Sequence, residues 1–282
     1  MIEGQPSHTA ERVAVERAAH QVLDSPLVLV DPLALRIIDA EHASRLQAHP
    51  EQHDTSPINR ITRAIVVVRS RIAEDEIARA ATAGVTQYVV LGAGLDTFAY
   101  RNPLPTVRVF EVDHADTQQR KRQRLAAGGI AVPERVTFVS CDFATVTSLA
   151  ALRQAGFDPT RPAVLAWLGV VMYLERPAVM QTLADIASLP AGTSVVFDYA
   201  VPPESLPFLS RQIYRRLLGR LDMAGEPWRS FFEPVTLRAD LDRLGFTDID
   251  DLGGDEINDR YLADRDDGLQ SGSVGRIVIA RR

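Results

Sequence analysis

Cysteine is almost absent from this chain of 282 residues: Cys141 is the only one. A disulfide within the chain is therefore excluded, and a zinc site built from cysteines is not expected. Among the six histidines, only His49 and His53 lie at a spacing of metal ligands, but Pro50 separates them and no carboxylate motif accompanies them. We therefore expect no metal ion.

Long apolar runs are lacking as well. No stretch approaches the roughly 20 apolar residues of a membrane span, and the first residues, MIEGQPSHTAERVAVERAAH, lack the apolar centre of a signal peptide. These two observations predict a cytoplasmic protein without a membrane partner.

Positive charge is also scarce, since the formal net charge is −6 and basic residues are spread along the chain. Lys121 is the only lysine. It belongs to the densest basic cluster, residues 120–124, which we interpret as the solvated face of a helix. This pattern argues against a nucleic-acid surface and leaves a small molecule as the expected partner.

What is present is an ordinary globular composition, with 46% apolar and 24% charged residues. Residues from about 10 to 82 show helical spacing of apolar positions, and Gly84 ends the last helix. From residue 85, five short β-branched runs alternate with helical segments, which predicts a mainly parallel sheet covered on both faces. After helices over about 204–243, two strand-like runs with an acidic loop between them predict an antiparallel hairpin at the sheet edge.

We therefore expect a single α/β domain with a seven-stranded, mostly parallel sheet. Its parts are a helical N-terminal cap over residues 1–84, a cofactor-binding core over 85–200, a helical lid over 201–243 and the C-terminal strands of the sheet over 244–282.

A glycine turn follows the first predicted strand, in QYVVLGAGLDTFAYR, residues 87–101. Gly92 and Gly94, with Ala93 between them, allow a sharp turn and a close approach to a ligand. Taken alone, such a turn is either a ligand site or a plain connection. In a doubly wound sheet, ligands bind beyond the carboxyl ends of the strands, which is where this turn lies.

Acidic residues end the next two predicted strands. Asp113 follows Gly92 at roughly the spacing of 20 residues at which an acid binds ribose hydroxyls. The third strand ends in Asp142 and Phe143, which suit the amino group and the ring of an adenine, although Phe143 is equally suited to core packing. These acids fit the adenosine of either a nicotinamide cofactor or S-adenosylmethionine.

The helix after the turn distinguishes these two cofactors. A pyrophosphate requires a bare helix N-terminus, whereas Asp96 or Thr97 is expected to cap this one. A carboxylate there repels a diphosphate, so S-adenosylmethionine, which has no phosphate, is favoured. Arg69 could pair with its carboxylate, but spacing alone is more typical of a surface arginine.

Several segments in fixed order resemble the leucine carboxyl methyltransferase family, and in particular its bacterial branch of S-adenosylmethionine-dependent methyltransferases. These segments are VVLGAGLDTFAYR, FEVDH, VSCDFATV, LGVVMYL and GEPWRSFFEP, together with the N-terminal TAERVAVERA and DSPLVLVDPLALRII. The resemblance covers most of the chain. It implies a Rossmann-like class I methyltransferase fold and S-adenosylmethionine as the methyl donor.

The resemblance also implies roles for individual residues. Arg69 would bind the methionine carboxylate, Gly92 to Gly94 would line methionine and ribose, Asp113 would bind the ribose hydroxyls, and Asp142 with Phe143 would hold adenine. Many members have a glutamate for the methionine ammonium where this chain has Leu168. Backbone carbonyls of Gly92 or Gly169 would then have to accept from that ammonium.

The acceptor is expected near four side chains. Tyr173 and Tyr199 follow the fourth and fifth strand patterns, and Trp228 and Arg229 lie in EPWRSFFEP of the lid. The aromatic rings could instead belong to the core or anchor the lid. Because the sequence shows no evident base, and a carboxylate needs none at neutral pH, a carboxylate acceptor is favoured over a phenol.

The expected function is therefore S-adenosylmethionine-dependent O-methylation of a small molecule, in keeping with secondary metabolism. Two alternatives remain: a non-catalytic cofactor-binding homologue, suggested by Leu168, and a nicotinamide-dependent oxidoreductase, suggested by the glycine turn and Asp113.

Overall fold

Alternating strands and helices build one sheet in the computed structural model, which describes residues 8–53, 56–141, 148–223 and 225–282. Over these residues the sheet has seven strands in the order β3-β2-β1-β4-β5-β7-β6. The strands are β1 (Gln87–Leu91), β2 (Arg108–Asp113), β3 (Val136–Ser140), β4 (Val164–Trp167), β5 (Ser194–Ala200), β6 (Asp248–Leu252) and β7 (Gly275–Arg281). The first five run parallel, and β7 is antiparallel to both β5 and β6. The predicted α/β fold is thereby confirmed.

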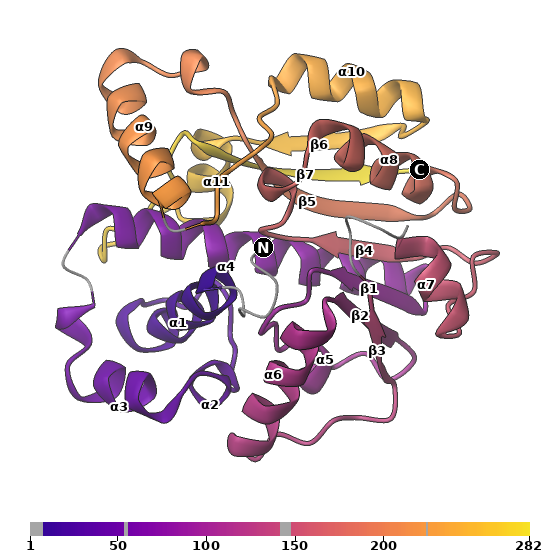
Figure 1. Cartoon of the computed structure of the whole chain (residues 1–282), viewed down its shortest axis with the longest axis horizontal. Helices are drawn as coiled ribbons and strands as arrows, with labels where there is room; N and C mark the ends of the chain where they lie inside the picture. Colours follow the sequence, from indigo (N-terminus) through magenta and orange to yellow (C-terminus); the bar gives the residue numbers. More distant parts are fainter. Residues whose placement is uncertain (1–7, 54–55, 142–147, 224) are drawn as a thin grey trace.

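Helices connect and cover these strands (Figure 1). They are α1 (His8–Leu23), α2 (Ala34–Ile37), α3 (Ala40–Ala48), η1 (Pro50–Gln52), α4 (Pro57–Thr82), α5 (Phe98–Arg101), α6 (Ala115–Ala127), α7 (Ser148–Gln154), η2 (Val171–Tyr173), α8 (Arg176–Ala187), η3 (Pro203–Ser205), α9 (Phe208–Met223), α10 (Pro234–Leu244) and α11 (Gly254–Tyr261). In Figure 1 the helices α1, α2 and α3 gather beside α4 at the lower left. None of the described helices combines the length and apolar character needed to cross a membrane.

Apolar side chains cover both faces of the sheet, because successive strand residues point to opposite sides. On one face Leu91, Trp167 and Phe197 belong to a cluster that α8 and α10 complete. On the other face Val90 and Ala166 pack with side chains of α4. The continuous apolar runs recognised in the sequence are therefore strands buried on both faces.

Helix α4 has clear start and stop signals. The Ser56 hydroxyl accepts a hydrogen bond from Ile58 N at 3.2 Å and so caps the helix. Gly84, just beyond the end, has φ +89°, which glycine adopts without steric cost. Between these ends Val68 and Ile72 pack against the sheet. Because α4 lies on the sheet, it can carry a side chain to the ends of the strands.

The acidic connection between β6 and β7 differs from the sequence prediction. A loop was expected, but residues Gly254–Tyr261 form helix α11. Glu256 accepts a hydrogen bond from Gly253 N at 2.9 Å, and negative charge in the first turn suits the helix dipole. Ile257 is buried in the core. A carboxylate cap and one apolar anchor thus stabilise a helix in a segment whose composition looks like a loop.

Candidate functional site

A cavity of about 600 Å³ opens where β1, β2 and β4 end. This position and size are typical of small-molecule sites in doubly wound sheets. The walls come from α1, α4, the turn after β1, the segment after β4, and residues 225–227 and 229. The sequence-predicted residues that line it are Arg69, Gly92, Ala93, Gly94, Asp113, Gly169, Tyr173 and Arg229.

The glycine turn after β1 forms the floor of this cavity. Gly92 and Gly94 have φ values of +70° and +43°, where a side chain would be strained. A Cβ on Gly92 would also come within 2.4 Å of the Val170 side chain. The amides of Gly92 and Ala93 both donate to Val112 O, at 2.8 and 3.1 Å. The turn is therefore tied to β2 and held open toward the cavity.

Asp113 lies directly against this turn. Its two carboxylate oxygens accept from Gly94 N and His114 N, each at 2.7 Å. Burial raises the pKa of Asp113, although these hydrogen bonds and Lys121 oppose the shift. His114 directly precedes α6 and caps it, because its Nδ1 accepts from Asp116 N at 3.3 Å.

Arg69 reaches the cavity from α4 and is held by a residue that the sequence analysis missed. Its Nη1 lies 2.8 Å from Asp198 Oδ2, and Asp198 Oδ1 accepts from Gly169 N at 2.6 Å. A Cβ on Gly169 would come within 2.7 Å of the Arg69 guanidinium, so glycine is required there. Arg69 and Asp198 are both buried. Asp198 was overlooked because it lies inside the apolar run of β5.

Asp96 lies between the glycine turn and α5, where either Asp96 or Thr97 was expected to cap the helix. Its Oδ1 accepts from Phe98 N at 2.8 Å, and its Oδ2 lies 3.2 Å from Arg17 Nη1 of α1. The predicted capping of α5 is thus carried by Asp96, whereas the Thr97 hydroxyl donates to Asp31 at 2.5 Å. Burial raises the pKa of Asp96, but the charges of Arg17, Lys121 and Arg101 outweigh it and lower that pKa. The N–H at this helix start is therefore already bound to a carboxylate.

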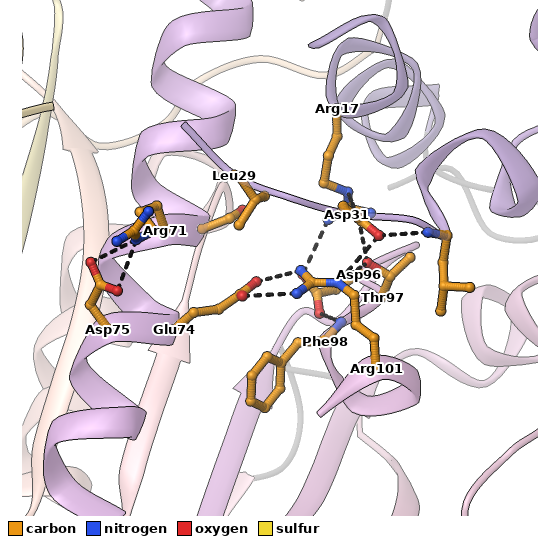
Figure 2. A network of polar contacts seen from close by, with 12 residues as sticks. Arg17, Leu29, Asp31, Arg71, Glu74, Asp75, Asp96, Thr97, Phe98 and Arg101 are labelled. Atoms are coloured by element: carbon orange, nitrogen blue, oxygen red, sulfur yellow. Dashed lines mark hydrogen bonds and ion pairs between the residues drawn. The ribbon is translucent and has the colours of Figure 1, made fainter. Parts of the chain in front are cut away.

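Figure 2 shows the buried ion pairs around this cap. Arg17 and Arg101 both pair with Asp31, at 3.1 and 3.2 Å, and Arg101 also pairs with Glu74 of α4 at 2.5 Å. Burial raises the pKa of Glu74, and Arg101 opposes that shift. The network joins α1, α4 and α5 beside the glycine turn, and it fixes their relative positions.

Lys121 corrects our interpretation of the basic cluster as a solvated face. Its side chain is only 1% exposed, and its Nζ lies 2.7 Å from Glu111 Oε1. The Tyr100 hydroxyl donates to the other oxygen of Glu111 at 2.8 Å. Lys121 Nζ also donates to Ala93 O at 3.5 Å. The single lysine is therefore a buried counterion beneath the glycine turn, because Glu111 on β2 points into the protein rather than into the cavity.

A carboxylate and two hydroxyls meet in the wall formed by α1 and the residues before α10. Thr9 N donates to Glu226 Oε1 at 3.2 Å, and Thr9 Oγ1 donates to Glu226 Oε2. Thr9 Oγ1 also lies 3.4 Å from the Tyr173 hydroxyl. Arg229 Nη1 lies 3.2 Å from Glu175 Oε1. All five side chains line the cavity. Glu226 belongs to GEPWRSFFEP, in which only aromatic rings and Arg229 were predicted to contact the acceptor.

Two residues predicted for the acceptor are placed elsewhere, which corrects those predictions. The described lining of the cavity includes neither Tyr199 nor Trp228. Tyr199 is buried in the sheet, and its hydroxyl donates to Asp251 Oδ2 at 2.8 Å. Trp228 packs on the core against Tyr214, with ring centroids 6.0 Å apart. Pro227 and Arg229, the neighbours of Trp228, line the cavity, but the rings of Tyr199 and Trp228 anchor β5 and the lid segment.

Three further residues were discussed for cofactor binding: Leu168, Asp142 and Phe143. Leu168 lines the cavity and packs against the α4 side of the sheet. The predicted adenine-binding residues Asp142 and Phe143 lie outside the described residues.

Comparison with known proteins agrees with this geometry. A family model described as "Leucine carboxyl methyltransferase" matches residues 10–187. A protein of Bacillus subtilis (strain 168), named "Putative S-adenosyl-L-methionine-dependent methyltransferase YktD", is 31% identical over 303 residues, with 96% of each chain covered. A Frankia alni protein with the same description is 32% identical over 278 residues, which cover 96% of this chain and 85% of the relative.

Solved structures share the fold. A crystal structure of a "putative methyltransferase" from Thermobifida fusca aligns with a TM-score of 0.59 at 18% identity, over 100% of this chain and 96% of that one. A "duf574 family protein" from Streptomyces avermitilis aligns with a TM-score of 0.58 at 18% identity, over 100% of both chains. At this level of identity the likeness concerns the fold alone.

Proposed function

This chain belongs to the leucine carboxyl methyltransferase family and is an S-adenosylmethionine-dependent methyltransferase, and from this premise we propose that it methylates an oxygen atom of a small molecule. One observation carries the proposal. Arg69, the glycine turn and Asp113 come from separate elements and line a single cavity at the ends of the parallel strands.

The chemistry of these side chains fits the cofactor. The Arg69 guanidinium would hold the methionine carboxylate, and its orientation by Asp198 suits a planar fork. Gly92, Ala93 and Gly94 would lie along the methionine and the ribose, and Asp113 would accept from the ribose hydroxyls. Asp142 and Phe143 would hold the adenine. We propose these roles for the cofactor-binding site.

The site suits a ligand without phosphate. A pyrophosphate would meet Asp96 at the start of α5, where its carboxylate already binds the Phe98 amide. This arrangement, together with the family assignment, argues against the nicotinamide-dependent alternative. For the methionine ammonium, Leu168 offers no charge, so we propose that the carbonyl oxygens of Gly92 and Gly169 accept from it.

Bound S-adenosylmethionine supplies an electrophilic methyl group. The chain itself positions the acceptor oxygen in line with that methyl group and excludes water, and proximity of this kind supplies much of the acceleration. Tyr173 and Arg229 line the cavity and are proposed to contact the acceptor. The N-terminal cap (residues 1–84) and the lid (201–243) would enclose it against the core (85–200), with residues 244–282 completing the sheet.

Two kinds of oxygen are compatible with this function. A carboxylate is already ionised at neutral pH, whereas a hydroxyl requires a group that takes its proton. The carboxylate was favoured while no base was evident in the sequence. We further propose that the enzyme acts in the cytoplasm on a compound of secondary metabolism, with no nucleic-acid partner, as its net charge of −6 suggests.

Transfer of a labelled methyl group tests this proposal. The full chain is incubated with S-adenosylmethionine labelled in its methyl group and a panel of small phenols, alcohols, carboxylic acids, amines and carbon nucleophiles, and organic products are extracted. Labelled ethers or esters that depend on Arg69 support the proposal. Transfer to nitrogen or carbon acceptors alone contradicts O-methylation, and absence of all transfer supports a non-catalytic homologue.

A further inference from the structure

Tyr173, Thr9 and Glu226 form a connected chain of polar groups in the cavity wall. Tyr173 ends η2 after β4, Thr9 lies in the first turn of α1, and Glu226 lies before α10. The Tyr173 hydroxyl is 3.4 Å from Thr9 Oγ1, which in turn donates to Glu226 Oε2. Segments far apart in the sequence thus bring two hydroxyls and a carboxylate to one side of the cavity.

The hydrogen-bond directions along this chain follow from proton counting. A hydroxyl has one proton to donate, and a carboxylate only accepts. Because Thr9 gives its proton to Glu226, its oxygen must accept from the Tyr173 hydroxyl. The Tyr173 proton is then committed to Thr9, and the Tyr173 oxygen presents a lone pair to the cavity. The Tyr173 oxygen can therefore accept a hydrogen bond from the O–H group of a bound molecule.

The charges on this side disfavour an anionic acceptor. Glu226 and Glu175 both line the cavity, and Arg229 is paired with Glu175. The other lining arginines are also paired, Arg69 with Asp198 and Arg17 with Asp96. An acceptor carboxylate would approach the Glu226 carboxylate and would find no donor at Tyr173, whose proton is committed to Thr9. A neutral hydroxyl can instead donate to the Tyr173 oxygen.

The remaining lining side chains on these segments are apolar. Val13 of α1, Val170 and Leu174 around η2, Ala178 of α8 and Pro227 of the lid segment all line the cavity. They suit the body of an apolar molecule and offer it no hydrogen bonds. The polar contact for such a molecule is therefore concentrated at Tyr173.

From these observations we propose that the acceptor is a neutral hydroxyl on an apolar, ring-sized body, bound through Tyr173, and that its proton leaves through Thr9 to Glu226. This inference rests on the proposed O-methylation and replaces the carboxylate expected from sequence alone. In the transfer the acceptor oxygen bonds to the methyl carbon, the carbon–sulfur bond breaks with its electron pair on sulfur, and the acceptor O–H bond breaks. Tyr173 takes that proton and passes its own to Thr9, which protonates Glu226.

Binding of two matched probes tests the proposal without knowledge of the natural acceptor. The full chain is saturated with S-adenosylhomocysteine and titrated at pH 7 with 2-naphthol, which is neutral, and 2-naphthoate, which is anionic. We expect 2-naphthol to bind about tenfold more tightly, the size of effect that one well-made hydrogen bond and avoided charge repulsion produce. Equal or tighter binding of 2-naphthoate, or no binding of either probe, would overturn the proposal.

Three variants distinguish this role from one in which the hydrogen bonds among Tyr173, Thr9 and Glu226 only stabilise the cavity wall. Tyr173→Phe should weaken 2-naphthol about tenfold and leave S-adenosylhomocysteine affinity unchanged. Glu226→Gln keeps the shape but removes the charge, and its amide can accept only one of the two hydrogen bonds from Thr9. 2-Naphthoate should then bind more tightly, and kcat for any methylated hydroxyl should fall more than KM changes. Glu204→Gln, an exposed partner of Arg215, is the control and should change none of these.

The outcomes also distinguish this inference from the proposed function. If S-adenosylhomocysteine itself does not bind, the proposed function fails at the first titration. If it binds while Tyr173→Phe leaves 2-naphthol affinity unchanged, the assignment of Tyr173 is wrong although the chain remains a methyltransferase.

Discussion

Arg69 of α4 and Asp198 of β5 form a buried ion pair, with Nη1 and Oδ2 2.8 Å apart. The other oxygen of Asp198 accepts from Gly169 N at 2.6 Å. Asp198 therefore fixes both Gly169, after β4, and Arg69, which is proposed to bind the methionine carboxylate. The position of Arg69 depends on a residue that would never touch the cofactor's adenosine.

Asp198→Asn should leave the buried Arg69 charge uncompensated. Breaking one partner of a buried pair costs about 3 kcal/mol, so we expect a loss of that order in the free energy of unfolding and weaker binding of S-adenosylhomocysteine. Chemical denaturation and calorimetry measure the two effects. Asp248→Asn removes the exposed partner of Arg281 and should change little. Equal effects of the two variants would contradict the assigned role of Asp198.

Asp113→Ala should weaken S-adenosylhomocysteine binding at least tenfold, because hydrogen bonds to a charged acceptor contribute about 1.5–3 kcal/mol each. Asp116→Ala, which removes an exposed carboxylate three residues later in the first turn of α6, is the matched control. Calorimetric titration compares them. Unchanged affinity in Asp113→Ala would refute the assignment of the ribose hydroxyls to this residue.

Leu168→Glu should supply a carboxylate at the position where many family members have one. Leu168 lines the cavity beside Gly169, so the new side chain can meet the methionine ammonium. We expect S-adenosylhomocysteine to bind about tenfold more tightly, the effect of a charge-assisted hydrogen bond. The protein without ligand should be less stable, because a new charge is partly buried. Weaker binding would show that the ammonium lies away from residue 168.

Glu76 predicts a specific dependence of stability on pH. Burial raises its pKa, but hydrogen bonds from Arg79 and Arg281 outweigh this and lower the pKa to about 2 from 4.5. Because the folded pKa is depressed, the contribution of Glu76 is complete above pH 4.5 and is lost as the pH falls toward 2. It amounts to roughly 3 kcal/mol.

The variant Glu76→Gln measures this contribution. The difference in unfolding free energy between wild type and variant should be greatest near neutral pH and should shrink steadily on acidification. Urea denaturation across this range gives both curves. A difference that stays constant with pH would mean that proton linkage at Glu76 does not stabilise the fold.

The sequence predicted those parts of the molecule that depend on local patterns. Apolar runs identified the strands, Gly92 and Gly94 identified the turn, and Asp113 followed from its spacing. Each of these features depends on residues that are close together in the sequence. Their meeting at one site follows from the fold, because the carboxyl ends of parallel strands lie at one edge of the sheet.

Contacts between distant segments could not be predicted. Asp198 lies within an apolar strand, Lys121 within a basic cluster, and Glu226 in a segment with three aromatic residues. Each has its role because of a partner that touches it in space but lies on another element: Arg69 of α4, Glu111 of β2 and Thr9 of α1. Tyr199 and Trp228 were misassigned for the same reason, since only the packing decides which side of a segment faces a cavity.

The most direct test of the account is a calorimetric titration of the full chain with S-adenosylhomocysteine. The cavity that Arg69, the glycine turn and Asp113 line should bind one molecule per chain with a dissociation constant well below millimolar. Arg69→Ala and Asp113→Ala should each weaken that binding. No binding at millimolar ligand would contradict the central claim that these residues form the cofactor site.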